Sequence, residues 1–288
     1  ANEASRLETP RSIYPLSTIS EIKEWCYHEG KTFWEYVSDC EGPEIWDYLD
    51  TVWETMCATI QRGLNNDGVL PGGLKVARKA STYWVKSKSY TDSLSSRAKI
   101  YAYALATSEE NASGGTVVTA PTCGSSGVMP AVLYHLSTSR NFLRIRILRA
   151  LATAGLFGNV AQTNSSISGA EVGCQGEVGV ACAMAAAAAC QLFGGTPSQI
   201  EYAAEMGLEH HLGLTCDPVC GLVQVPCIER NAIAAARAFD ANAYATLSDG
   251  SHMVSFDKVV EVMNETGHAL PSLYRETSEG GLAKRFKR

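Results

Sequence analysis

Apolar residues recur at helical spacing along most of the chain. They return every three or four residues in the segments 97–110, 231–247 and 256–266. Regular alternation of apolar and polar residues, which marks a half-buried strand, is almost absent. The segment 116–119 (Thr-Val-Val-Thr) is the exception, and it fits either a short strand or extended chain. The pattern therefore predicts an all-α fold forming a compact helical domain.

One helix start is marked clearly by its sequence. Thr196 suits the N-cap position, Pro197 the first helical position, and Gln199 the third, where its side chain completes a capping box. We expect this helix to run to about His211. A second helix, rich in alanine, is expected over 181–190, and no internal repeat is found.

Charged residues are distributed unevenly. The 288 residues are 45% hydrophobic and 19% charged, which is enough to form a large core. No charged residue occurs between Glu110 and Arg140, or in 150–170 and 178–200. These stretches are rich in Ala, Gly, Ser and Thr, whereas a membrane span needs about 20 strongly apolar residues. We therefore expect them to form the buried centre of a protein without membrane spans.

The overall charge limits the partners. Formal net charge is −6, and no basic block is longer than the tail 284–288, so a nucleic-acid partner is not expected. The chain begins without an apolar signal-peptide run. It also has ten cysteines, yet it is long enough to fold without disulfides. Reduced thiols and a cytoplasmic location are therefore expected.

Two clusters of small polar residues are candidate ligand-binding segments. The turn 120–127 precedes a helix expected from about Val128, and a helix N-terminus favours an anion such as a substrate carboxylate. Alternatively, its small residues allow two helices to approach closely. The second cluster, 163–171, lies in an uncharged region, where polar groups need partners, although it also fits a surface loop. The candidate substrate-binding residues are Thr122, Ser125, Ser126, Asn164, Ser165, Ser166 and Ser168.

Three cysteines stand beside glycine, proline or turn-forming residues. These are Cys174, Cys216 and Cys227, and such positions at helix ends allow a thiolate to point into a cavity. Cys182 and Cys190 instead lie inside the alanine-rich helix, where thiols act as small apolar groups. No Cys-x-x-Cys pair occurs, which is unlike a zinc ribbon or a thioredoxin-type centre. Spacing alone leaves a metal or cluster role for the three open beside that of inert core thiols.

Longer motifs around these cysteines resemble a known family. The segments are 168–179 (SGAEVGCQGEVG), 213–219 (GLTCDPV) and 225–232 (VPCIERNA), together with the turn 120–122 and the ending 274–283 (YRETSEGGLA). They are similar to the catalytic α domain of the iron–sulfur L-serine dehydratases, and the similarity extends from about residue 50 to the C-terminus. The whole chain, 1–288, is then expected to be one such domain, with 1–50 as a helical or linker extension.

The resemblance implies a cofactor and a reaction. By it, loops at helix ends place Cys174, Cys216 and Cys227 on three irons of a [4Fe–4S] cluster, and the open fourth iron is the Lewis acid that activates the hydroxyl of L-serine. The products are pyruvate and ammonia, a step of amino-acid degradation and gluconeogenesis. Pyridoxal phosphate is not expected, because no lysine lies between Lys99 and Lys258 to form the Schiff base.

Several points stay open at this stage. His210 and His211 precede Cys216 and are the candidate catalytic bases, although a partner domain can also supply the base. Cys123 or Cys220 can cap the open iron. The family implies a β-type regulatory domain, on the same or a separate chain, and a homo-oligomer is expected. The alternatives are a related lyase acting on threonine or cysteine, or a helical redox sensor that is no enzyme.

Overall fold

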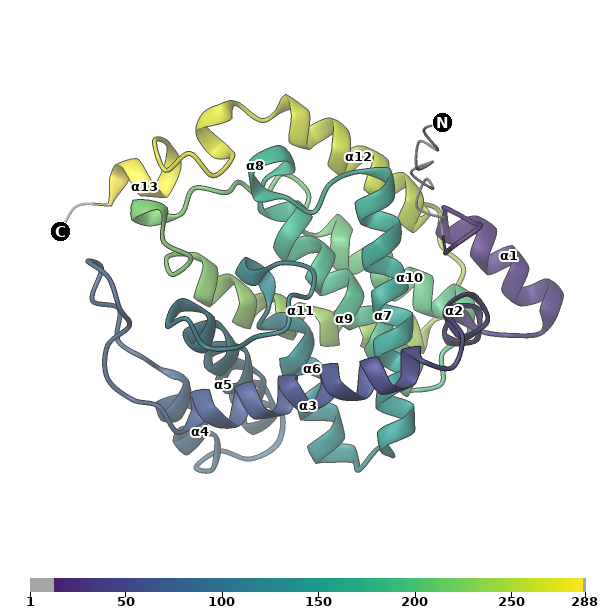
Figure 1. The fold of residues 1–288 in the computed structure, drawn as a ribbon, viewed down its shortest axis with the longest axis horizontal. Coiled ribbons are helices and arrows are strands. Elements are labelled where there is room, and N and C mark those ends of the chain that lie inside the picture. Colours follow the sequence, from purple (N-terminus) through teal and green to yellow (C-terminus); the bar gives the residue numbers. More distant parts are fainter. Residues whose placement is uncertain (1–12, 287–288) are drawn as a thin grey trace, which may run out of the picture.

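The computed structural model describes residues 13–286, and over this range the regular secondary structure consists of helices joined by loops (Figure 1). Its strand-like pairing is limited to two isolated bridges, so the prediction of an all-α fold is confirmed. The segment 116–119 is extended chain and not a strand. The helices are α1 (Ile19–Glu29), α2 (Phe33–Glu41), α3 (Ile45–Leu64), α4 (Ala80–Ser87), α5 (Asp92–Ala112), α6 (Val128–Arg140), α7 (Arg144–Asn164), α8 (Gly169–Val172), α9 (Val180–Leu192), α10 (Pro197–Glu209), α11 (Cys227–Leu247), α12 (Phe256–Ala269) and α13 (Gly281–Arg285).

The alanine-rich helix α9 lies at the centre of the fold. It packs against α6, α7, α10 and α11, which surround it in Figure 1. Its residues 180–190 are all buried, so the uncharged stretch around it forms the core, as predicted. Burial also raises the pKa of Cys182 to about 12 and that of Cys190 to about 11. Inside α9, these two thiols pack as small apolar groups of the core.

The predicted capping box opens α10. Thr196 Oγ1 accepts a hydrogen bond from the Gln199 main-chain N–H, and Gln199 Oε1 accepts one from the Thr196 N–H at 2.9 Å. The helix ends at Glu209, two residues before the expected end at His211. Local sequence signals thus predict both α9 and α10, and the structure confirms these two helices.

The first part of the chain covers two sides of this core. Helices α1 and α2 contact α10, α12 and α7, and they bury Ile19, Ile22 and Phe33 completely. Helices α3 and α4 pack on α5. The part of the predicted extension within 13–50 therefore shares the common core, while its residues 1–12 lie outside the described part.

All ten cysteines are free thiols in the structure. Among the described helices, none combines the length and the apolar character that a membrane span requires.

Helices α3 and α5 approach so closely that one position requires glycine. A Cβ on Gly63 would lie 2.3 Å from the main-chain oxygen of Ala106. Gly63→Ala is therefore expected to lower the free energy of unfolding by about 1–3 kcal/mol, because the two helices must separate. Chemical denaturation followed by circular dichroism measures this change.

The matched control is Gly155→Ala in α7, where a Cβ would meet nothing within 4 Å. This substitution should stabilise the protein by roughly 0.5–1 kcal/mol, because alanine loses less backbone entropy than glycine in a helix. Equal effects of the two substitutions would show that the contact between α3 and α5 is not tight.

Candidate metal centre

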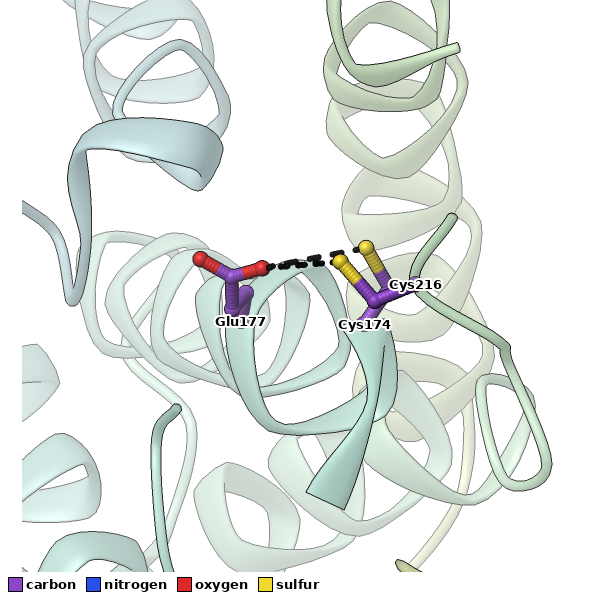
Figure 2. Close-up of side chains that lie close together, drawn as sticks. All are labelled: Cys174, Glu177 and Cys216. Atoms are coloured by element: carbon purple, nitrogen blue, oxygen red, sulfur yellow. Dashed lines mark hydrogen bonds between the residues drawn. The ribbon is translucent and has the colours of Figure 1, made fainter. Parts of the chain in front are cut away.

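Two thiols and one carboxylate meet at the ends of helices near the middle of the molecule. The ligand atoms of Cys174, Glu177 and Cys216 all lie within 4.8 Å of one another (Figure 2). Glu177 Oε2 is 3.8 Å from the Sγ of Cys174 and 3.7 Å from the Sγ of Cys216. The two cysteines are 2% and 3% exposed. The sequence thus brings residues from two distant segments into one buried group.

An unusual backbone segment presents Cys174 and Glu177. Helix α8 ends at Val172 and is capped by Gly173. The φ of Gly173 is +76°, and a Cβ built there would lie 2.7 Å from the main-chain oxygen of Leu214; both features require glycine. A π-helical turn, η2 (Gln175–Gly179), follows and continues into α9. Such turns are rare and occur frequently at functional sites. Here the turn places Glu177 on the same side as Cys174.

Cys216 is held by pairing with the C-terminal segment. Its main-chain N–H donates to the Tyr274 oxygen at 2.8 Å, and the Glu276 N–H donates to the Cys216 oxygen. The ending that carries part of the family resemblance therefore fixes the backbone of a candidate ligand. Burial raises the pKa of Glu177, and the negative charge of the Glu276 side chain raises it further, so this segment contributes to the electrostatics of the site.

Cys227 is the first residue of α11 and is buried, but its Sγ does not belong to the tight group of three. Burial, with the negative charges of Cys174 and Glu177, raises its pKa to about 12. One turn further along α11, the guanidinium of Arg230 donates to the Thr215 oxygen at 2.6 Å. The start of α11 therefore adds a third thiol and one cation beside the loop that carries Cys216.

Hydrogen bonding between the two close thiols shifts their pKa values in opposite directions. The hydrogen bond from Cys216 lowers the pKa of Cys174, and the positive charge of Arg230 lowers it further. The same hydrogen bond, together with burial, raises the pKa of Cys216. Since thiolates and not thiols bind metals, this arrangement favours a metal-binding form of Cys174.

Glycines leave room for this group. A Cβ on Gly169 would lie 2.5 Å from Glu177 Oε2 and 3.0 Å from the Sγ of Cys216, and one on Gly124 would lie 3.0 Å from Glu177 Oε1. The N-terminus of α8 and the turn that contains Gly124 therefore line the centre with main chain. Buried thiols inside a cradle of glycines are chemically suited to a soft metal or an iron–sulfur cluster, so the residues present fit such a group.

The turn 120–127 lies against this centre. Thr122 Oγ1 donates to Glu177 Oε1 at 2.8 Å, and Ser125 is buried with its hydroxyl 3.0 Å from that of Thr122. The hydroxyl of Ser126 donates to the Cys123 oxygen at 2.8 Å. At the start of α6, the Gly127 N–H donates to Asn231 Oδ1. The binding of a substrate carboxylate by this turn stays a prediction.

The second polar cluster is divided by the structure. The Asn164 amide donates to the main-chain oxygens of Ser17 and Val160, and the hydroxyl of Ser165 contacts Asn264. Ser166 Oγ accepts a hydrogen bond from the main-chain N–H of Ser168. Ser168 is the N-cap residue of α8 and directly precedes Gly169, which borders the centre. Ser168 therefore lies next to the site in the chain, while the side chains of Asn164 and Ser165 join the end of α7 to the segment before α1 and to α12.

The two histidines proposed as bases occupy different environments. His210 is exposed, and its Nδ1 lies 3.0 Å from the Met206 oxygen. His211 is buried, its Nδ1 lies 2.7 Å from the Gly207 oxygen, and burial lowers its pKa to about 4. Cys123 and Cys220, the candidate capping thiols, are both exposed.

Glu177 and Arg230 are two residues of the site that were not predicted from the sequence, although both lie in the motifs 168–179 and 225–232. The signal that identifies them is spacing: each follows a candidate ligand cysteine by three residues, Cys174 and Cys227 respectively. Residues three apart share a face of a helical turn.

The all-α fold, with two thiols and a carboxylate gathered at helix ends, places the chain in the class of helical proteins with a candidate metal centre. Within that class, the profile of the family described as "Serine dehydratase alpha chain" matches residues 12–283, and the chain belongs to this family. It is 51% identical over 94% of its length to an L-serine dehydratase of Streptomyces coelicolor, 48% over 94% to L-serine dehydratase 1 of Escherichia coli, and 40% over 95% to an L-serine dehydratase of Helicobacter pylori. The chain spans only 61–62% of these relatives' lengths.

Proposed function

We propose that this chain is the catalytic α part of an L-serine dehydratase, which converts L-serine to pyruvate and ammonia with a [4Fe–4S] cluster. The observation that carries the proposal is the meeting of Cys174 and Cys216 beside Glu177 in a buried glycine cradle. Family membership, and relatives named as L-serine dehydratases, support the same reaction. Because the relatives are longer, we propose that a β-type regulatory domain or subunit and self-association complete the enzyme.

The cluster would be held by the thiolates of Cys174, Cys216 and Cys227. When bound, it supplies a Lewis acid that assists departure of the substrate hydroxyl. The cation of Arg230 offsets the negative charge of the thiolates from the side of α11. A centre that depends on thiolates also needs a reducing compartment, and the proposed location is the cytoplasm.

The protein's own residues would handle the protons. We propose Glu177 as the base that takes the α-proton of L-serine, because its carboxylate is an acceptor, is anchored by Thr122 and directly faces the thiols. Loss of the α-proton and of the β-hydroxyl, which departs as water, gives aminoacrylate. This compound tautomerises to an imine and is hydrolysed to pyruvate and ammonia. His211 is the second candidate, but its low pKa makes it a weaker base near neutral pH.

The carboxylate of the substrate is proposed to bind where the turn 122–127 and Ser168 approach the centre. Both segments lie close to Glu177, because a Cβ built on Gly124 or on Gly169 would lie within 3.0 Å of one of its carboxylate oxygens. Thr122, Ser125 and Ser126 bring hydroxyl groups from one side, and Ser166 and Ser168 from the other. Hydrogen-bond donors at these positions would fix the orientation of the α-carbon toward the base.

The test is pyruvate formation by the full-length enzyme, prepared anaerobically without added pyridoxal phosphate. L-serine is expected to give pyruvate at a kcat/KM at least tenfold above those for deamination of L-threonine and L-cysteine. Preference for either of the other two would assign a related lyase. A chain that carries the cluster but converts none of the three amino acids would instead be a redox sensor.

Activity is expected to decay in air and to return with ferrous iron and a reductant. Three cysteines leave one iron without a protein thiolate, and an exposed iron is the one most readily lost on oxidation. The measurement follows pyruvate formation and visible absorbance together after exposure to air, with an anaerobic sample as control. An enzyme that keeps full activity in air while the absorbance is lost would show that the reaction does not require the cluster.

A further inference from the structure

A small cavity lies between α5 and the segment that leads into α11. Its volume is about 70 Å³, and its lining includes Lys79, Glu109, Gln224 and Pro226. Glu109 is 1% exposed and Gln224 is 4% exposed. Each has one buried oxygen without a hydrogen-bond partner, Glu109 Oε2 and Gln224 Oε1. Two unpartnered acceptors therefore come from side chains that line the same cavity.

The other polar atom of each side chain has at least one partner. Glu109 Oε1 accepts from the main-chain N–H groups of Lys79 at 2.7 Å and Ala80 at 3.2 Å, at the start of α4. The Gln224 amide nitrogen donates to the Pro71 oxygen at 2.8 Å. Since the Pro71 oxygen only accepts, the nitrogen must face it, which fixes Oε1 as the free atom of Gln224.

Neighbouring cations are engaged elsewhere. Lys79 Nζ pairs with Glu229 at 2.9 Å, and the guanidinium of Arg78 is bonded to Glu110 and Ser113. Among the residues that line the cavity, two carboxylates, of Glu109 and Glu229, face one ammonium, of Lys79, so their formal charge is −1. Burial raises the pKa of Glu109, which means that its charge is poorly compensated by the protein alone. The missing component is a donor or a positive charge.

We propose that this cavity binds a monovalent cation, either ammonium or an alkali metal ion, between Glu109 Oε2 and Gln224 Oε1. One unit of positive charge neutralises the lining. A divalent ion is disfavoured, because two positive charges exceed the single negative charge of the lining. The bound cation links α5 to Gln224, whose main-chain oxygen accepts from the Ile228 N–H at the start of α11. It therefore steadies the segment that positions Cys227, and it does not depend on the proposed reaction.

Thermal unfolding of the intact protein tests the site. The reference buffer contains tetramethylammonium chloride as its salt, and KCl, NaCl, RbCl or NH₄Cl replaces it at constant ionic strength. One of these small cations is expected to raise Tm by about 3–6 °C, and the rise should saturate with cation concentration. A Tm shift of this order is expected for a domain of this size when the ligand is present at about 100 times its Kd. A response to ammonium but not to potassium assigns the ion as ammonium, and the reverse assigns an alkali metal ion.

Glu109→Gln is the decisive variant. Its amide oxygen can still accept from Lys79 and Ala80, while its NH₂ group supplies the donor that Gln224 Oε1 lacks. The Tm of this variant should therefore be independent of the cation. Glu205→Gln is the matched control, a buried carboxylate on α10 outside the cavity, and it should keep the response of the unsubstituted protein.

A direct readout is anomalous scattering from a crystal soaked in RbCl, with density expected between the two free oxygens. Gln224→Met, which removes one oxygen ligand, should abolish this density even if Glu109→Gln fails to fold. Identical Tm values in all salts, with ordered water or no density in the cavity, would overturn the proposal. That result would indicate a protonated Glu109 or water alone at the site.

Discussion

Alanine in place of Cys216 is expected to abolish both the visible absorbance of the cluster and pyruvate formation. The same result is expected for Cys174→Ala and for Cys227→Ala. With three thiolates as the only proposed protein ligands, the loss of one leaves two anchors, too few to hold a cluster that is exposed at its fourth iron. Absorbance, iron content and anaerobic pyruvate formation, measured on the same preparations, record the effect.

The controls are Cys182→Ala and Cys190→Ala. Both side chains are fully buried inside α9, and neither belongs to the group of Cys174, Glu177 and Cys216, so neither thiol is expected to bind the cluster. These variants should keep the absorbance and most of the activity. Survival of an unchanged cluster in all three ligand variants would show that the ligands lie elsewhere.

Glu177→Gln should lower kcat by about 10²–10⁴-fold, the range expected when a positioned base is lost. The amide oxygen of glutamine can still accept from Thr122, so the turn 122–127 should keep its place. The cluster absorbance is therefore expected to remain. Steady-state kinetics with L-serine, beside the absorbance spectrum of the same sample, measure both quantities.

Two comparison variants sharpen this result. Glu171→Gln changes an exposed carboxylate of the same motif and should leave kcat within about twofold of the original value, as expected for a surface substitution. His211→Asn removes the other candidate base. A large loss of kcat in His211→Asn, with normal kcat in Glu177→Gln, would assign the proton transfer to His211. Loss of the absorbance in Glu177→Gln would make Glu177 a ligand.

The helical architecture was largely predictable because its signals are local. The capping box at Thr196 and the uncharged, alanine-rich composition of α9 identify elements from a few neighbouring residues each. The close contact of Gly63 with Ala106 was not predictable, because it depends on how α3 and α5 cross. Likewise, the rare π-helical turn η2 has no sequence pattern that separates it from an ordinary helix.

The site was predictable only in part. The turn-forming neighbours of Cys174 and Cys216 indicated thiols at helix ends, and the structure brings these two together with Glu177. Pairing of Cys216 with Tyr274 could not be inferred, because it joins segments almost 60 residues apart through the main chain. The polar cluster at 163–171 was ambiguous for a similar reason: only tertiary contacts separate Asn164, bonded to Ser17, from Ser168 beside the centre.

The most direct test of the central claim is Mössbauer spectroscopy of the ⁵⁷Fe-enriched protein, isolated anaerobically and measured with and without L-serine. The proposal predicts about four irons per chain in one cluster and a change at a single iron when L-serine is added, because three irons are held by Cys174, Cys216 and Cys227. D-serine, added as a control, should cause a smaller change. A protein without iron, or a cluster whose irons all ignore L-serine, would contradict the account.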